Sequence, residues 1–173
     1  NINLRKALIF TQFTLSLAFI ASTTIGYRQY RNFLSFDLGF STENILNIQM
    51  QGTKADPFIK ELREISEVGM ISKSLMVTSV GTMYGIHMKY KDLSDSAGIW
   101  FNSIDEHYLP LHGHRLIAGR NFLPKAPGSE ESEIIVNEQI LKRFQIGKSI
   151  PANAIGEALV LEGKRLTIIG VVK

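Results

Sequence analysis

The stretch ALIFTQFTLSLAFIASTTIGY, from Ala7 to Tyr27, contains no charged side chain. At about 1.5 Å of rise per helical residue it spans roughly 31 Å, close to the hydrocarbon thickness of a bilayer. Basic residues flank both ends, with Arg5 and Lys6 before the stretch and Arg28 and Arg31 after it. The sequence therefore predicts a retained transmembrane helix.

A signal peptide and a buried core helix are the two alternatives. Arg5 and Lys6 suit the basic start of a signal peptide, but its apolar region is only about 7–15 residues long, and this one continues to Tyr27. The flanking charges balance, so the positive-inside rule gives no orientation by itself. Because that rule governs short loops, the long segment after Arg31 favours cytoplasmic Arg5 and Lys6 and an extracytoplasmic domain.

Small residues recur along one side of this predicted helix. They follow a 4-3-4-3 spacing, at Ala7, Thr11, Thr14, Ala18 and Ala21. Small side chains allow the backbones of two membrane helices to approach closely. The pattern predicts a helix-packing stripe, and a lone anchor with incidental small residues is the alternative.

The rest of the chain predicts one domain. We expect the transmembrane helix and a helical stalk over residues 1–36, a linker over 37–44 and a core domain over 45–173. The predicted class is α/β (α+β), with strand–helix units followed by a β-rich part. The first unit combines a strand at Ile45–Met50, a helix with Asp56 as its N-cap, and a second strand at Met70–Met76.

The β-rich part begins with two strand-like runs, residues 83–90 and 97–104, which the turn-forming KDLSDS (91–96) separates. Asn137 follows a short apolar run and predicts the cap of a second strand–helix unit. Near the end of the sequence, Gly163 lies between two apolar, β-branched arms and predicts a hairpin turn.

Composition excludes several classes of function. The net charge is +3, of which the first 31 residues contribute +4, while residues 45–173 carry 15 basic and 14 acidic side chains. No basic stripe with interleaved aromatic residues occurs, which argues against a nucleic-acid partner. The absence of cysteine excludes disulfides and thiolate metal sites.

Motifs for catalysis are also missing. IGKS (146–149) lacks the earlier glycine of a P-loop because Lys142 stands there, and no Gly-x-Ser-x-Gly elbow occurs. We therefore expect no catalytic residues, no cofactor and no metal. Polar side chains that invite a site are better explained structurally: the histidines as exposed residues on a strand, Asp105 and Glu106 as a helix N-terminus, and Trp100 as a core or interface residue. The four histidines are His87, His107, His112 and His114.

Five motifs, taken together in order, resemble permease subunits of FtsX/MacB-type ABC transporters. Their ranges are 4–23 (LRKALIFTQFTLSLAFIAST), 37–48 (DLGFSTENILNI), 119–122 (GRNF), 134–144 (IIVNEQILKRF) and 155–173 (IGEALVLEGKRLTIIGVVK). Each motif is weakly specific alone, and their order and spacing carry the resemblance across nearly the whole chain. His112 and His114 depart from it, because the family pattern is usually apolar there.

The resemblance implies a non-enzymatic fragment with one membrane helix and one periplasmic domain in the cell inner membrane. A separate cytoplasmic ABC ATPase would hydrolyse ATP, and the stalk would transmit its motion to the periplasmic domain. The assembly that the resemblance implies would also contain other permease helices or a second permease copy, membrane lipid and a periplasmic partner protein. The competing class is a membrane-anchored extracytoplasmic sensor domain of a signalling receptor.

Overall fold

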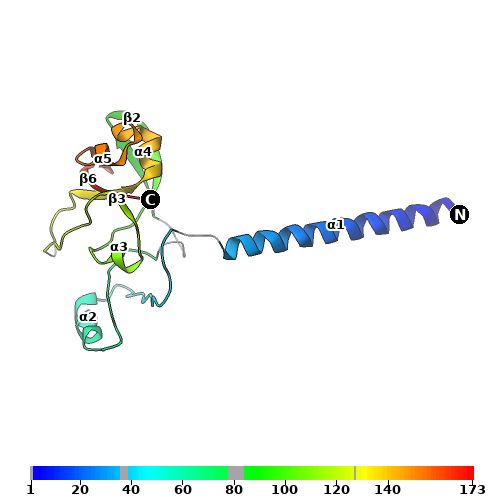
Figure 1. Ribbon diagram of the computed structural model, residues 1–173, viewed down its shortest axis with the longest axis horizontal. Coiled ribbons are helices and arrows are strands. Elements are labelled where there is room, and N and C mark those ends of the chain that lie inside the picture. Colours follow the sequence, from blue (N-terminus) through cyan, green and yellow to red (C-terminus); the bar gives the residue numbers. More distant parts are fainter. Residues whose placement is uncertain (1, 36–38, 78–83, 127) are drawn as a thin grey trace. The chain divides into compact units, whose positions relative to one another are not determined.

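The computed structural model describes residues 2–35, 39–77, 84–126 and 128–173. Contacts divide the chain into two compact units, Asn1–Leu38 and Gly39–Lys173 (Figure 1). The boundary falls inside the expected 37–44 linker, and Asp37 and Leu38 lie outside the described residues.

The first unit is the single helix α1, Ile2–Leu34. Its 33 residues correspond to roughly 50 Å, about 20 Å more than a bilayer core requires. The helix is long and apolar enough to cross a membrane, with a mean hydropathy of 1.6 in its most apolar window. Thr23 and Thr24 donate their hydroxyls to the carbonyls of Phe19 and Ile20, four residues earlier, so these polar groups are satisfied within the helix.

The second unit, here called the core domain, is an α+β domain, as the sequence predicts. Its helices are α2 (Ala55–Arg63), α3 (Tyr108–Leu111), α4 (Glu138–Phe144) and α5 (Pro151–Ala154), with the 3-10 turn η1 (Ile146–Ser149) between the last two. Its strands are β1 (Tyr84–Tyr90), β2 (Asp92–Phe101), β3 (Leu116–Gly119), β4 (Glu133–Asn137), β5 (Ala158–Leu161) and β6 (Lys164–Val172).

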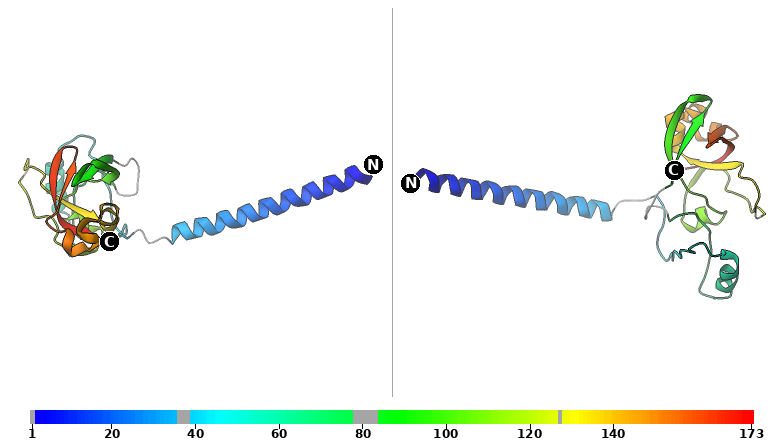
Figure 2. Two further views of the ribbon diagram at one scale, coloured as in Figure 1. Left: turned by 90° about the horizontal axis from the view of Figure 1, so that it is seen from above. Right: turned by 180° about the vertical axis from the view of Figure 1, so that it is seen from behind.

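All six strands form one sheet in the order β2-β1-β5-β6-β3, and β4 pairs with β6 in parallel (Figure 2). The other pairings are antiparallel. Strand β6 is the centre of the arrangement, because β3, β4 and β5 all pair with it. The β1–β2 hairpin joins the sheet through two residue pairs of β1 and β5, Met88 with Leu161 and Lys89 with Val160.

Local signals predicted several of these elements correctly. The side chain of Asn137 accepts a hydrogen bond from the backbone N–H of Ile140 and so caps α4. Glu162 and Gly163 have φ values of +48° and +83° and form the two-residue turn between β5 and β6. Both residues need left-handed backbone, which fits a hairpin turn that follows the twist of the strands.

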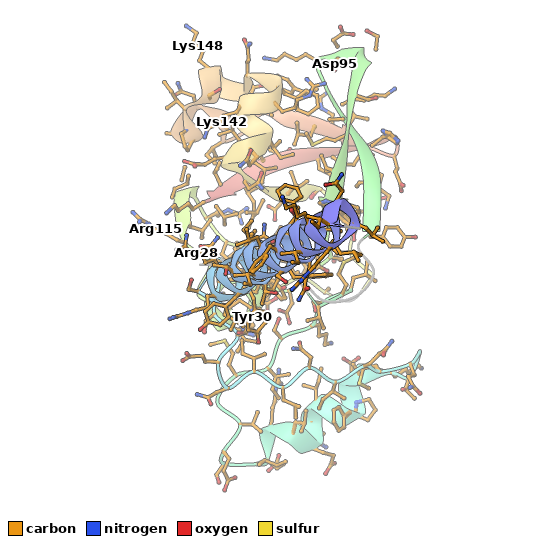
Figure 3. All side chains as sticks on the ribbon, turned by 90° about the vertical axis from the view of Figure 1, so that its right-hand side faces the viewer. Arg28, Tyr30, Asp95, Arg115, Lys142 and Lys148 are labelled. Carbon is orange, nitrogen blue, oxygen red and sulfur yellow. The ribbon has the colours of Figure 1, made fainter. Side chains whose placement is uncertain are left out.

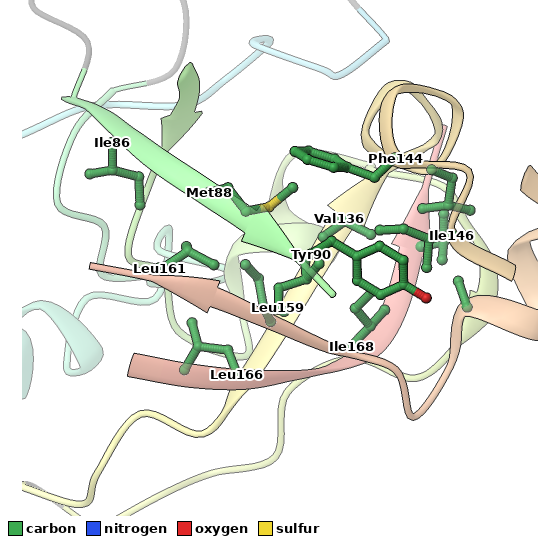
Figure 4. Packing of buried hydrophobic residues seen from close by; sticks show 14 residues of the cluster. Ile86, Met88, Tyr90, Val136, Phe144, Ile146, Leu159, Leu161, Leu166 and Ile168 are labelled. Carbon is green, nitrogen blue, oxygen red and sulfur yellow. The ribbon is translucent and has the colours of Figure 1, made fainter. Parts of the chain in front are cut away.

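The hydrophobic core lies between the sheet and helix α4 with its following turn (Figure 4). Met88 of β1, Leu159 of β5 and Ile168 of β6 have no exposed surface, and Leu141 and Ile146 cover them from the helical side. The alternation of buried and exposed residues along β1 and β5 matches a strand with one face in the core.

The expected first strand–helix–strand unit is wrong apart from its helix. Residues 45–50 form no strand, and residues 70–76 contribute only an isolated bridge from Ser74 to Ile104. Asp56 is not the cap of α2, because Lys54 occupies that position and makes no side-chain cap bond. Asp56 instead pairs with Lys73 Nζ at 2.6 Å, which lowers the pKa of the Asp56 carboxyl.

The expected KDLSDS turn is also wrong, since β2 begins at Asp92 and most of this hexapeptide is strand. The chain reverses at Lys91, whose φ is +49°. Asp92 accepts hydrogen bonds from the backbone N–H and hydroxyl of Ser94, so polar residues here stabilise a strand end. Asp95 forms a bidentate pair with Arg143 of α4, at 2.7 and 3.1 Å, and ties the hairpin to that helix.

Candidate functional site

The helix-packing stripe lies on α1. At 100° per residue, Ala7, Thr11, Thr14, Ala18 and Ala21 fall within an arc of about 80° on one face. No residue of α1 is buried, so this face is uncovered in the described part of the chain. Its role in packing against another helix stays a prediction.

The core domain begins with a short stretch, Gly39–Ser41, which we call the leading segment. It lies against the C-terminal end of α3 through two hydrogen bonds of the Ser41 backbone, one with the backbone and one with the side chain of His112. The N–H of Ser41 donates to the carbonyl oxygen of His112 at 2.7 Å, and Nδ1 of His112 lies 3.1 Å from the carbonyl oxygen of Ser41. Since a carbonyl oxygen only accepts, His112 carries a proton on Nδ1 and donates it to Ser41.

Four rings gather at this contact, and we call Phe40, Tyr108, His112 and His114 the histidine cluster. Phe40 stacks on His114 with ring centroids 5.6 Å apart, and Tyr108 lies 4.4 Å from His112. Tyr108 and His114 are also stacked, at 5.9 Å. Tyr108 and His112 are one helical turn apart, so α3 presents both rings to the leading segment.

Burial shapes the electrostatics of this cluster. His112 is buried, with 6% of its surface exposed, and His114 is half-buried. Burial lowers the pKa of His114, and the neighbouring charge of His112, when protonated, lowers it further. Both causes favour the neutral imidazole.

The residues that follow His114 contact β6, the last strand of the sheet. Leu116 of β3 pairs with Val172 of β6, and the N–H of Lys173 donates to the carbonyl oxygen of Arg115 at 3.2 Å. His112–Leu116, which we call the junction segment, therefore contacts the leading segment at one end and the end of β6 at the other.

The expectation of exposed histidines on a strand is wrong for His112, which is buried at the C-cap of α3. His114 lies before β3, and Gly113 between them has φ +65°, a left-handed conformation that ends the helix. His87 lies on β1, and His107 lies 3.7 Å from Glu106. Among the described residues no group of three or more His, Cys, Asp or Glu side chains could hold a metal ion.

The expected helix N-terminus at Asp105 and Glu106 is wrong, because α3 begins at Tyr108 with His107 as its N-cap. Asp105 precedes this helix and connects two distant parts of the chain. One carboxylate oxygen accepts from the hydroxyl of Ser72 at 2.6 Å and from the N–H of His107 at 3.2 Å. The other accepts from the N–H of Lys73 at 2.7 Å. Asp105 thus attaches the strandless segment after α2 to the connection between β2 and α3.

The IGKS motif forms the turn η1 and has a packing role. Gly147 has φ +56°, and a Cβ added there would lie 2.7 Å from the backbone carbonyl carbon of Asn153. The glycine is therefore needed for close contact with α5. Lys142 and Lys148 are exposed, and their side chains extend into solvent from α4 and η1 (Figure 3).

Trp100 is 71% exposed, so it is not a core residue. It pairs with Gly85 across the β1–β2 hairpin, where its ring lies 3.4 Å from the position of an added Cβ. An interface role for Trp100 stays a prediction.

The sequence did not predict the histidine cluster. The local signal was the four-residue spacing of Tyr108 and His112, but Phe40 is far away in the sequence.

Comparison with known proteins agrees with this fold. The profile of the family described as the MacB-like periplasmic core domain matches residues 15–173. A search of curated proteins gives no match.

Two solved structures show the same fold. The periplasmic region of MacB from Actinobacillus actinomycetemcomitans is 16% identical, with a TM-score of 0.52 over 76% of this chain and 53% of that one. The extracellular domain of the noncanonic ABC-type transporter YknZ from Gram-positive bacteria is 18% identical, with a TM-score of 0.51 over 79% and 59%. The chain thus spans less than two thirds of each structure. The profile match covers most of the sequence, and the chain belongs to the family of MacB-like periplasmic core domains, which supports its resemblance to FtsX/MacB-type permeases.

Proposed function

We propose that this chain is the mechanical coupling part of an ABC transporter permease subunit. In this function it transmits the ATP-driven motion of a separate cytoplasmic ATPase to the periplasmic domain, for export or extraction of a substrate. The observation that carries the proposal is the junction segment, because it contacts both the leading segment and the end of β6. A displacement of the leading segment therefore acts directly on the central strand of the sheet.

The nature of α1 supports this proposal. A candidate membrane helix followed by a domain of a periplasmic family indicates a membrane-anchored extracytoplasmic domain. The helix is continuous to Leu34, so its end beyond Tyr27 extends the span as a stalk. Because each backbone carbonyl within a helix is hydrogen-bonded, such a stalk transmits rotation and tilt with little bending.

The proposed partners are the ATPase, further permease helices or a second permease copy, membrane lipid and a periplasmic partner protein, in the cell inner membrane. The proposed role is non-enzymatic, since motion and not bond chemistry is the output. Family membership favours this role over the membrane-anchored sensor, which would share the anchor and an extracytoplasmic domain.

An insertion tests the coupling. Four glycines between Asp37 and Leu38 of the full-length permease add up to roughly 13 Å of slack before the leading segment. We expect the permease to assemble with its ATPase and to retain ATP hydrolysis, while transport falls by at least tenfold.

The matched control places the same four glycines between Gly128 and Ser129, in the loop that precedes β4. This insertion leaves the junction segment unchanged and should preserve transport. Equal transport by both variants would contradict mechanical coupling, and a chain that neither binds an ATPase nor supports transport would favour the sensor.

A further inference from the structure

The histidine cluster contains two imidazoles at a contact formed mainly by rings and backbone. The ring centroids of His112 and His114 lie 6.1 Å apart. The leading segment itself carries no titratable side chain, because its residues are Gly39, Phe40 and Ser41. A charge at this contact therefore has to come from an imidazole, and His114 is the one that stacks on Phe40 of the leading segment.

We propose that His114 makes this contact pH-dependent, so that the neutral imidazole holds the leading segment on α3 and the protonated imidazole releases it. This device goes beyond mechanical coupling and rests on it only for its consequence in transport. The pH response of the contact can be measured without any transport activity.

Protonation of His114 acts on the stacked rings. The imidazole of His114 is half-buried and stacks on Phe40 of the leading segment and on Tyr108 of α3. A charge on this ring is poorly solvated in the closed contact, and opening of the contact relieves that cost by exposing the imidazole to water.

Among the described residues, the charges around the cluster give no compensation within ion-pair distance. Charged side chains near the cluster along the chain are Glu43 after the leading segment, Glu106 and His107 before α3, and Arg115 and Lys173 at the adjoining strand ends, while Asp37 before the leading segment lies outside the described residues. The carboxylate of Glu106 lies beside His107, at 3.7 Å. In the described part of the chain, neither imidazole of the pair has a carboxylate within 4 Å.

The sign of the pH effect follows from the lowered pKa of His114. The contact is fully stabilised above the ordinary histidine pKa of about 6.5, and this stabilisation is lost as the pH falls below it. Each histidine coupled to release changes the opening equilibrium by at most tenfold per pH unit.

Hydrogen exchange at the Ser41 amide measures the opening, because this N–H donates to His112. The full chain in detergent micelles is compared at pH 7.5 and pH 5.5, after correction for the intrinsic exchange rate at each pH. We expect the protection factor of Ser41 to fall by about three- to tenfold at pH 5.5. The amide of Ile168, in the core, provides the reference and should change little.

Variants assign the effect to His114. His114→Phe keeps a ring for stacking and removes the charge, so the protection factor should become independent of pH, and His114→Gln repeats the test if the first variant does not fold. His87→Gln, which changes an exposed side chain of β1, should behave like the wild type. Equal protection at both pH values in the wild type, or a pH effect that persists in both His114 variants, would overturn the proposal. Transport is not measured, so failure of the proposed coupling would leave this result unchanged.

Discussion

Replacement of Asp105 by alanine should detach the segment after α2 from the rest of the core domain. The carboxylate accepts three hydrogen bonds, from the Ser72 hydroxyl, the Lys73 N–H and the His107 N–H. Loss of the first two leaves the residues around Ser74 attached by two backbone bonds and by the side chain of Asn102, which bonds both the N–H and the carbonyl oxygen of Met76. We therefore expect local opening of this segment while the sheet stays folded.

The magnitude follows from the two bonds that cross to this segment. A hydrogen bond to a charged group contributes about 1.5–3 kcal/mol. The Ser72 bond is only partly buried and the Lys73 bond is exposed, so we expect a combined loss of about 2–3 kcal/mol, at the low end for two such bonds. This corresponds to roughly 30- to 150-fold faster exchange of the amides in the segment.

Hydrogen exchange measured by mass spectrometry checks this prediction on peptides that cover residues 70–77 and, as the reference, residues 158–172. Asp105→Asn keeps one acceptor oxygen and should give a smaller increase. Asp95→Ala, which removes an exposed pair with Arg143, is the matched surface control and should leave the segment unchanged. Unaltered exchange around Ser74 in Asp105→Ala would refute this account of the attachment.

Three further predictions concern the membrane helix, the sheet and pH. Ala18→Phe in the full-length permease should reduce assembly with its partners at least tenfold, because the larger side chain would separate helices that pack along the stripe. Ile20→Phe, on another face of the helix, should have little effect. Co-purification of the partners with each variant measures assembly. Gly119→Ala should lower the free energy of unfolding, measured by chemical denaturation, by more than about 3 kcal/mol. Its Cβ would lie 2.1 Å from a backbone oxygen of β6, and the φ of Gly119 is +76°. Gly98→Ala is the control and should be nearly neutral, because a Cβ added at Gly98 has no atom within 4 Å. The hydrogen bond from Arg120 lowers the pKa of the Glu133 carboxyl. The stability that this ion pair gives the fold should therefore be present above the ordinary glutamate pKa of 4.5 and lost as the pH falls. Glu133→Gln should remove that part of the pH dependence of the thermal unfolding temperature.

Elements that depend on neighbouring residues were predictable from the sequence. Asn137 caps α4 through an N–H only three residues away, and Gly163 forms the turn of a hairpin whose arms follow directly. These signals act within one turn of chain, so sequence spacing contains them fully. The resemblance to FtsX/MacB-type permeases likewise rested on ordered local motifs, and the family match confirms it.

Elements that depend on a distant partner were not predictable in this way. Residues 45–50 alternate apolar and polar side chains as a strand does, yet in the described part of the chain no strand lies beside them. Alternation shows that a segment is able to form a strand, but it does not show that a second strand lies beside it to pair with. His112 was mistaken for an exposed residue for the same reason, because Ser41 and Phe40, which cover it, precede it by about seventy residues.

The sheet topology determines where a force applied at the leading segment would act. Strand β6 pairs with three other strands, so a displacement of the junction segment in the proposed mechanism reaches β3, β4 and β5 together. The β1–β2 hairpin is held to this group by two residue pairs with β5, by the Tyr90 hydroxyl and the Lys91 ammonium, which both contact Glu157, and by the buried side chains of β1 in the core. Buried apolar side chains hold neighbouring elements more firmly than exposed ion pairs, which contribute about 1 kcal/mol or less. Motion should therefore carry the hairpin together with β3–β6, and with it Trp100, which is 71% exposed on β2.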